Sequence, residues 1–163
     1  MRIIIDGPDG AGKTTLVKKL ADHFGCDILV LTENGSKNFT DYLHKAGLNN
    51  IVSDRSFLSE IVYADVFERP SELTPAHQEA LLQFYRANMW QIIILNASVS
   101  CLHERLNLRG DEDLSKIVNL EKLRQAYKYL STNYGLPMLD SETLDFEKLV
   151  KDLEDMKYVS HHG

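Results

Sequence analysis

The residues with the clearest chemistry lie close to the start of the chain. The stretch Gly7–Thr14 matches the spacing G-x-x-x-x-G-K-[ST] and follows the apolar run Ile3–Ile5. Glycines at this spacing let backbone N–H groups surround a polyphosphate, the lysine reaches the outer phosphates, and the threonine hydroxyl is placed to bind Mg²⁺. The stretch therefore predicts a phosphate-binding loop for a nucleoside triphosphate such as ATP. We expect the nucleotide to contact Gly7, Asp9, Gly10, Ala11, Gly12, Lys13, Thr14 and Thr15.

Charged residues also follow other apolar runs of the sequence. In an open parallel sheet, ligands bind beyond the carboxyl ends of the strands, so residues directly after each run belong near the loop. Phosphoryl transfer needs cations for the transferring group and a residue that positions or deprotonates the acceptor. The catalytic candidates are Lys13, Glu33 after the second run, Arg55 after the third, and Arg105 and Arg109 on or after the helix behind the fourth. Asp54 joins Thr14 as a candidate Mg²⁺ ligand, directly or through water.

Short β-rich runs alternate with longer helical patterns along the chain. This alternation predicts an α/β fold in which a parallel five-stranded sheet carries helices on both faces. The expected strands are Arg2–Asp6, Asp27–Thr32, Asn50–Ser53, Gln91–Asn96 and Leu136–Leu139. The expected helices span roughly 13–24, 37–46, 55–68, 75–89, 98–109, 115–133 and 143–156, with Ser98 and Thr143 as N-caps.

Composition narrows the class of protein. With 163 residues and 44% hydrophobic content, the chain suits one sizeable core, so we expect a single domain over residues 1–163. A formal charge of -6 argues against a broad basic surface that binds nucleic acid. A small basic groove that binds the end of a nucleic-acid strand is compatible with this charge. No apolar run approaches the roughly eighteen residues of a membrane span, and the start does not resemble a signal peptide. We therefore expect a cytoplasmic protein without a membrane partner.

One segment after the third strand has the spacing of a pocket wall. Arg55, Ser59 and Tyr63 recur every four residues, which would place them on one face of a helix. Tyr63 and Phe67 are the aromatic residues that we expect beside a bound base, because the other aromatic residues at helical spacing are better explained as core.

Several passages, in matching order, resemble the thymidylate kinase and deoxynucleoside kinase group of P-loop kinases. Residues 6–15 resemble the loop E/D-G-x-D-G-x-G-K-[ST]-T of thymidylate kinases, and residues 54–63 resemble their D-R-x-x-x-S-x-x-x-Y segment. Residues 102–111 resemble the passage from helix to lid that carries arginines onto ATP. The resemblance covers most of the chain and implies a P-loop NTPase fold, ATP with Mg²⁺, a short lid around 105–115, and a small-molecule nucleotide or nucleoside acceptor. The acceptor site that it implies contains Asp9, Glu33, Arg55, Ser59, Tyr63 and Phe67, with Asp9 holding the deoxyribose.

Departures from the thymidylate kinase pattern leave the acceptor open. Residues 32–35 read Thr-Glu-Asn-Gly where those kinases commonly carry Arg-Glu-Pro-Gly, so an arginine that grips an acceptor phosphate is missing there. Deoxynucleoside kinases use a glutamate at this point as the base for a 5′-hydroxyl, and Glu33 matches it. An anionic monophosphate needs cations more than a base, whereas a hydroxyl benefits from a nearby carboxylate.

We expect a thymidylate-like deoxynucleoside monophosphate as the acceptor. The alternative is a deoxynucleoside or polynucleotide 5′-hydroxyl kinase. A P-loop ATPase or switch that acts through a partner fits less well, because the chain has no Asn-Lys-x-Asp guanine reader. A homodimer and a nucleic-acid end are further partners that the sequence leaves open.

Lys13→Ala should remove most phosphoryl transfer, because the lysine supplies a charge to the transferring phosphate. The sequence also predicts an exposed Lys13 in the ligand-free protein, so stability should change little. Acceptor-dependent ATP consumption and thermal unfolding test the two parts, and near wild-type turnover would contradict the assignment of this loop.

Overall fold

The β-rich runs form one parallel sheet. Its strands are β1 (Arg2–Asp6), β2 (Asp27–Val30), β3 (Ile51–Asp54), β4 (Gln91–Asn96) and β5 (Met138–Asp140). They pair in the order β2-β3-β1-β4-β5, and every pairing is parallel. The computed structural model describes residues 1–32, 35, 37–110 and 117–159, with the side chains of 157–159 excepted. The predicted α/β fold with a parallel five-stranded sheet is confirmed.

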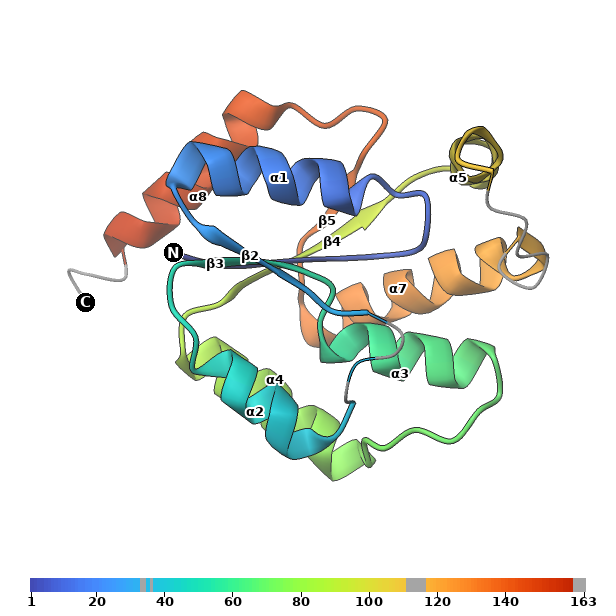
Figure 1. Cartoon of the computed structure of the whole chain (residues 1–163), viewed down its shortest axis with the longest axis horizontal. Helices are drawn as coiled ribbons and strands as arrows, with labels where there is room; N and C mark the ends of the chain where they lie inside the picture. Colours follow the sequence, from blue (N-terminus) through green and yellow to red (C-terminus); the bar gives the residue numbers. More distant parts are fainter. Residues whose placement is uncertain (33–34, 36, 111–116, 160–163) are drawn as a thin grey trace.

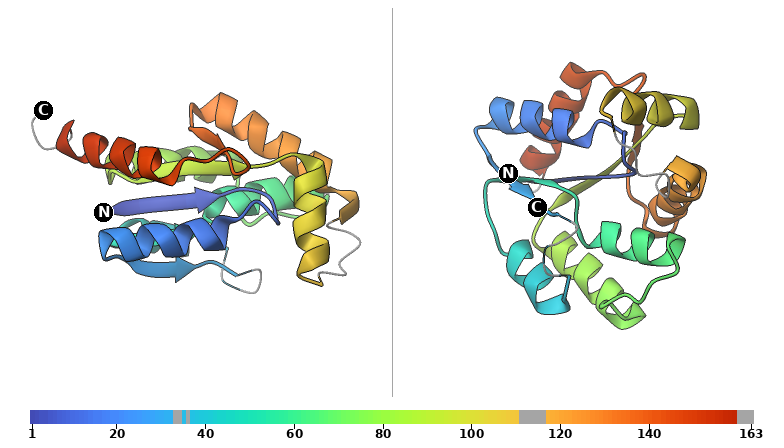
Figure 2. Two further views of the ribbon diagram at one scale, coloured as in Figure 1. Left: turned by 90° about the horizontal axis from the view of Figure 1, so that it is seen from above. Right: turned by 45° about the vertical axis from the view of Figure 1, so that its right-hand side comes forward.

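Helices cover both faces of this sheet (Figure 1). One face carries α1 (Lys13–Phe24) and α8 (Phe146–Val159). The other face carries α2 (Phe39–Ala46), α3 (Phe57–Val66), α4 (Pro75–Ala87) and α7 (Leu120–Tyr134). Figure 2 shows α5 (Val99–Leu108) lying across the end of the sheet toward which the strands run. The carboxyl ends of the strands, where ligands bind in this architecture, therefore face α5.

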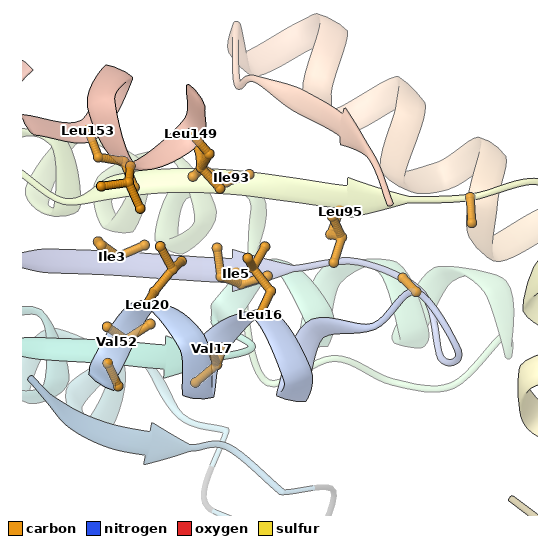
Figure 3. Close-up of a cluster of buried hydrophobic side chains, with 14 of the residues drawn as sticks. Ile3, Ile5, Leu16, Val17, Leu20, Val52, Ile93, Leu95, Leu149 and Leu153 are labelled. Carbon is orange, nitrogen blue, oxygen red and sulfur yellow. The ribbon is translucent and has the colours of Figure 1, made fainter. Parts of the chain in front are cut away.

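Strand β1 carries three consecutive isoleucines because both of its faces are buried. Ile3 and Ile5 pack on the side of α1 and α8, together with Leu16, Leu20 and Leu153 (Figure 3). Ile4 points to the opposite face and joins the cluster under α3, α4 and α7. A central parallel strand is buried on both faces, and its sequence is therefore apolar without alternation.

The register of the sheet places the phosphate-binding loop. Ile5 of β1 lies beside Asp54 of β3, and Asp6 lies beside Ile94 of β4. The chain therefore leaves β1 between the ends of two neighbouring strands, and it enters α1 directly after the loop.

Several predicted boundaries differ from the structure. The helix expected over 55–68 begins at Phe57, because Arg55 has a left-handed backbone (φ 77°) and the Ser56 hydroxyl caps the helix. Thr143 was a wrong N-cap: α8 begins at Phe146, and the Asp145 carboxylate accepts the Lys148 N–H at 3.1 Å. Ser98 is the N-cap of α5, as predicted.

The predicted lid over 105–115 is only partly described. Residues 105–108 form the last turn of α5, and residues 111–116 lie outside the described residues. Among the helices of the described ranges, none combines the length and the apolar character that crossing a membrane requires.

Gly7→Ala should be far more damaging than Gly25→Ala. Gly7 has φ 145°, and a Cβ at this position would lie 2.0 Å from the backbone oxygen of Leu95. We expect a loss of more than about 3 kcal/mol in the free energy of unfolding, because β4 or the loop must move. Gly25→Ala is the control: it has φ 61° but nothing within 4 Å of the added carbon, so it should cost about 1–2 kcal/mol. Equal losses in urea unfolding would contradict the close approach of Gly7 to β4.

Candidate active site

The phosphate-binding loop connects the end of β1 to the start of α1. Gly12 has φ 91° and precedes the first helical residue, and no described side chain caps the helix start. The first N–H groups of a helix have no intrahelical partner, so an uncapped N-terminus binds anions. The loop therefore has the backbone arrangement that a phosphate group requires.

A cavity of about 170 Å³ lies against this loop. Its lining combines loop residues with the ends of β2 and β3 and with the residue after α5. The lining residues are Asp9, Gly10, Gly12, Lys13, Thr14, Val30, Leu31, Asp54, Arg55 and Arg109. Three of the predicted ATP contacts do not line the cavity: Gly7 and Ala11 are buried, and Thr15 is exposed on α1.

Lys13 lies inside the loop rather than in solvent. Its side chain is buried, and its ammonium group donates a hydrogen bond to the Pro8 carbonyl at 2.7 Å. The prediction that Lys13 is exposed without ligand is therefore wrong, because the loop itself supplies the first partner for the charge. Burial, followed by the nearby charge of Arg55, lowers the pKa of Lys13 to about 8. A bound phosphate would favour the charged form again.

Thr14 and Asp54 bring two oxygen atoms together at the loop. The Thr14 hydroxyl donates to Asp54 Oδ2 at 2.6 Å. Hydroxyl and carboxylate oxygens are ligands that Mg²⁺ accepts, usually together with waters and substrate phosphates. The two predicted Mg²⁺ ligands therefore fit such an ion. The described residues contain no group of three His, Cys, Asp or Glu side chains that could hold a metal without a substrate.

Arg55 and Asp9 also line the cavity, and they contact one another. The Arg55 guanidinium forms an ion pair with Asp9, and the Tyr63 hydroxyl donates to the same carboxylate at 2.9 Å. The guanidinium also lies 5.1 Å from the centre of the Tyr63 ring. These residues come together as predicted, but Arg55 precedes α3 and does not share its helical face.

The backbone of Arg55 is held in its unusual conformation by two neighbours. Its N–H donates to the Ile5 carbonyl at 2.9 Å, and its own carbonyl accepts the Ser53 hydroxyl at 2.8 Å. A left-handed backbone is strained for a residue with a side chain, and such strain persists only where the surroundings fix it. The strained turn carries the guanidinium from β3 toward the loop.

The other predicted acceptor residues have three different outcomes. Tyr63 and Phe67 stack with their ring centres 5.8 Å apart and their planes 17° apart. Ser59 does not present its hydroxyl to the cavity, because it donates to Asp6 Oδ1 at 2.7 Å and accepts from Arg55 at 3.3 Å. Glu33 lies outside the described residues, so its place in the site stays a prediction.

Asp6 and Tyr127 form a part of the site whose contacts the sequence did not predict. Asp6 is fully buried, and its carboxylate accepts hydrogen bonds from the Gly7 N–H and from the hydroxyls of Ser56, Ser59 and Tyr127. Tyr127 lies in the apolar stripe of α7, at helical spacing from Leu123 and Leu130, which is the pattern of a core residue. The sequence around it contains no motif that would assign a function to its hydroxyl.

The two predicted lid arginines occupy different places. Arg105 lies within α5 and donates to the Gly10 carbonyl at 3.2 Å and to the Ser141 hydroxyl at 2.8 Å. Arg109 ends α5, is exposed, and lines the cavity. Arg105 therefore connects α5 to the phosphate-binding loop by a hydrogen bond. Arg109 is the one of the two arginines that lines the cavity.

Comparison with known proteins agrees with this geometry. No family model matches the chain. It is 29% identical over 154 residues to a Methanocaldococcus jannaschii protein named "Putative adenylate kinase", covering 94% of this chain and 84% of that one. It is 25% identical over 171 residues to the "Probable thymidylate kinase" of Sulfurisphaera tokodaii, covering 85% and 86%.

A solved structure extends this likeness to the whole chain. The crystal structure of the Bacillus subtilis YorR protein, in complex with phosphorylated GDP, superposes with a TM-score of 0.78 at 25% identity. The match covers 100% of this chain and 99% of that one. The resemblance to the thymidylate kinase and deoxynucleoside kinase group of P-loop kinases is confirmed.

The buried charge of Lys13 predicts a distinctive pH dependence of stability. Below pH 8 the folded protein carries the penalty of a buried ammonium, and between pH 8 and 10.5 the folded protein has lost a proton that the unfolded chain retains. Stability must therefore rise with pH in this window. From about pH 7.5 to about pH 9.5, the wild type should gain roughly 2 kcal/mol relative to Lys13→Met. Urea unfolding at both pH values measures this, and a constant difference between the two proteins would refute the penalty.

Proposed function

We propose that the chain is a P-loop nucleotide kinase that transfers the γ-phosphate of ATP to a deoxynucleoside monophosphate, with thymidylate as the reference acceptor. The product would be the corresponding diphosphate, with ADP as the second product. The acceptor would bind between the phosphate-binding loop and α3, on the side of Arg55 and Tyr63.

The loop residues would hold the donor. Lys13 would leave the Pro8 carbonyl and contact the outer phosphates, and Arg109 would add a second charge from the edge of the cavity. Thr14 and Asp54 would hold Mg²⁺, which neutralises phosphate charge when bound. Arg105 would act on ATP indirectly, by fixing the carbonyl of Gly10.

One observation favours a monophosphate acceptor: the carboxylates that line the cavity already bind other side chains of the protein. A 5′-hydroxyl acceptor benefits from a carboxylate within hydrogen-bond reach, which removes its proton. The carboxylates in the described lining are Asp9 and Asp54, and both are already engaged: Asp9 with Arg55 and Tyr63, Asp54 with Thr14. A phosphate acceptor has no proton to lose at the attacking oxygen and needs a cation.

Arg55 supplies a cation for that phosphate. A guanidinium carries five N–H donors, so its contacts with Asp9 and Ser59 are compatible with a further bond to a phosphate oxygen. Arg69 and Arg86, the other arginines in this part of the fold, are committed elsewhere. Arg69 pairs with the buried Glu60 at 2.6 Å, and Arg86 donates to the Tyr134 carbonyl.

The remaining acceptor contacts follow from this placement. A carboxylate has about four acceptor positions, so Asp9 would still accept a hydrogen bond from the sugar hydroxyl while it stays paired with Arg55. The stacked rings of Tyr63 and Phe67 would bound the space for the base. Ser59 would contribute through Arg55, because its hydroxyl is already bonded to Asp6.

A catalytic role of Glu33 would replace the monophosphate acceptor with a hydroxyl acceptor. If the acceptor were a nucleoside or polynucleotide 5′-hydroxyl, Glu33 could serve as its base, whereas a monophosphate acceptor needs no such base. A P-loop switch would consume ATP without any acceptor.

Paired substitutions of Arg55 and Glu33 separate the two acceptor classes. With a monophosphate acceptor, Arg55→Ala should lower kcat/KM for the acceptor by about a hundredfold, through the lost charge-assisted bond, while Glu33→Gln should change it less than about threefold. Steady-state kinetics with the acceptor that the wild type phosphorylates fastest measures both.

Arg124→Ala is the matched control, because Arg124 forms an ion pair on the surface with Glu121, three residues away on α7. A severe effect of Glu33→Gln beside a mild effect of Arg55→Ala would replace the monophosphate with a hydroxyl acceptor. ATP turnover that no acceptor changes would replace the kinase with a switch.

A further inference from the structure

Tyr127 brings a polar group into the site from α7. Its side chain is fully buried among the apolar residues of that helix, and its hydroxyl lies 2.8 Å from Asp6 Oδ1 and 3.1 Å from Ser59 Oγ. Helices α3 and α7 pack against one another beneath the sheet (Figure 1), so the contact joins two neighbouring helices to the end of β1. A phenylalanine would fill the same apolar space, and the hydroxyl therefore needs its own explanation.

Asp6 is the centre of the contacts that this hydroxyl completes. Asp6 Oδ1 accepts from the Gly7 N–H at 2.8 Å, from Ser59 at 2.7 Å and from Tyr127, while Asp6 Oδ2 accepts from Ser56 at 2.7 Å. One carboxylate thus joins the first residue of the phosphate-binding loop, the start of α3 and the middle of α7. A fully buried carboxylate is costly unless it is hydrogen-bonded, so each donor contributes to holding it in this orientation.

The protons of this cluster determine how Ser59 is oriented. Tyr127 and Ser59 each carry one hydroxyl proton, and both oxygens lie within hydrogen-bond distance of Asp6 Oδ1. With both protons directed to the carboxylate, the Ser59 oxygen has lone pairs left to accept from Arg55 Nη1 at 3.3 Å. The Tyr127 hydroxyl packs against the Ser59 oxygen and limits rotation of the Ser59 side chain.

We propose that Tyr127 is a positioning residue for phosphoryl transfer, which fixes Asp6 and Ser59 and, through Ser59, the guanidinium of Arg55. The inference rests on the proposed function for the acceptor that Arg55 would bind. The contacts from Tyr127 to Arg55 are independent of which acceptor that is. Loss of the hydroxyl would leave Asp6 Oδ1 with two donors, the Gly7 N–H and the Ser59 hydroxyl, and would remove the contact on the other side of the Ser59 oxygen. Ser59 would then be held less firmly, and its bond to Arg55 would weaken.

Tyr127→Phe tests this role, and Tyr85→Phe is its matched control. Tyr85 is a second buried tyrosine of the same apolar cluster, and its hydroxyl donates to the Tyr42 carbonyl at 3.1 Å, apart from the site. Both variants lose one buried hydroxyl, so a merely structural role predicts similar kinetics for the two. Positioning predicts that Tyr127→Phe alone lowers kcat/KM for the acceptor by about tenfold, the lower end of the effect known for residues that orient the ligands of a metal site.

Tyr127→Phe should also change the kinetic parameters for the acceptor more than those for ATP. The Gly7 N–H keeps its bond to Asp6 in Tyr127→Phe, so KM for ATP should stay within about twofold of wild type while the acceptor parameters change. In the Ser59→Ala background, the further loss from Tyr127→Phe should shrink below about twofold, because the route to Arg55 is already cut. Equal acceptor kinetics in Tyr127→Phe and Tyr85→Phe, or full additivity with Ser59→Ala, would overturn the proposal.

A measurement without turnover separates this proposal from the proposed function. The NMR order parameter of the Arg55 Nε–H group should fall in Tyr127→Phe and stay at the wild-type value in Tyr85→Phe. If no monophosphate is phosphorylated but the order parameter falls, the proposed function fails and the positioning role stands. An unchanged order parameter overturns the positioning role. If Tyr127→Phe does not fold, Ser59→Ala must give the same fall, and its failure to do so overturns the proposal as well.

Discussion

A single buried carboxylate joins the parts of this site. Asp6 ends the central strand, is fully buried, and accepts hydrogen bonds from the phosphate-binding loop, from α3 and from α7. A carboxylate without these partners would be several kcal/mol too costly to bury, and the partners have no comparable reason to meet without it. Burial and the Asp6 charge raise the pKa of Tyr127 well above its ordinary value, so this hydroxyl keeps its proton and donates it. The loop proposed to bind ATP and the arginine proposed to bind the acceptor are thus supported by the same group.

Two of the cations that line the cavity, Lys13 and Arg55, have protein partners in the ligand-free protein, and bound substrates would compete for them. Asp9 partly compensates Arg55, and the Pro8 carbonyl holds the Lys13 ammonium. The net charge of the chain is -6, so the positive field that phosphates meet is local to this cavity rather than a property of the whole surface. A phosphate bound at this loop would raise the lowered pKa of Lys13 by favouring its charged form.

Features of the site that depend on local sequence were predictable. The spacing of Gly12, Lys13 and Thr14 fixes the loop, and the positions of strand ends bring Asp54 to Thr14 across the sheet. The alternation of strands and helices predicts the layers, because each segment carries its own apolar period.

Features that depend on tertiary contacts were not predictable. The left-handed turn at Arg55 requires the Ile5 carbonyl and the Ser53 hydroxyl, and the burial of Lys13 requires the loop closed around it. The Tyr127 hydroxyl donates to Asp6, which lies 121 residues away in the sequence. A single sequence does not distinguish such a tyrosine from an ordinary core residue, because it lies on an apolar helical stripe.

The position of the transferred phosphate tests the central claim most directly. Phosphorus NMR of a reaction with ATP, Mg²⁺ and each of a panel of deoxynucleosides, deoxynucleoside monophosphates and oligonucleotides with free 5′ ends identifies both products. The account predicts that ADP appears together with an equal amount of a deoxynucleoside diphosphate, and only when a monophosphate is present. New phosphate on a 5′-hydroxyl, or ADP and inorganic phosphate formed without any acceptor, would contradict it.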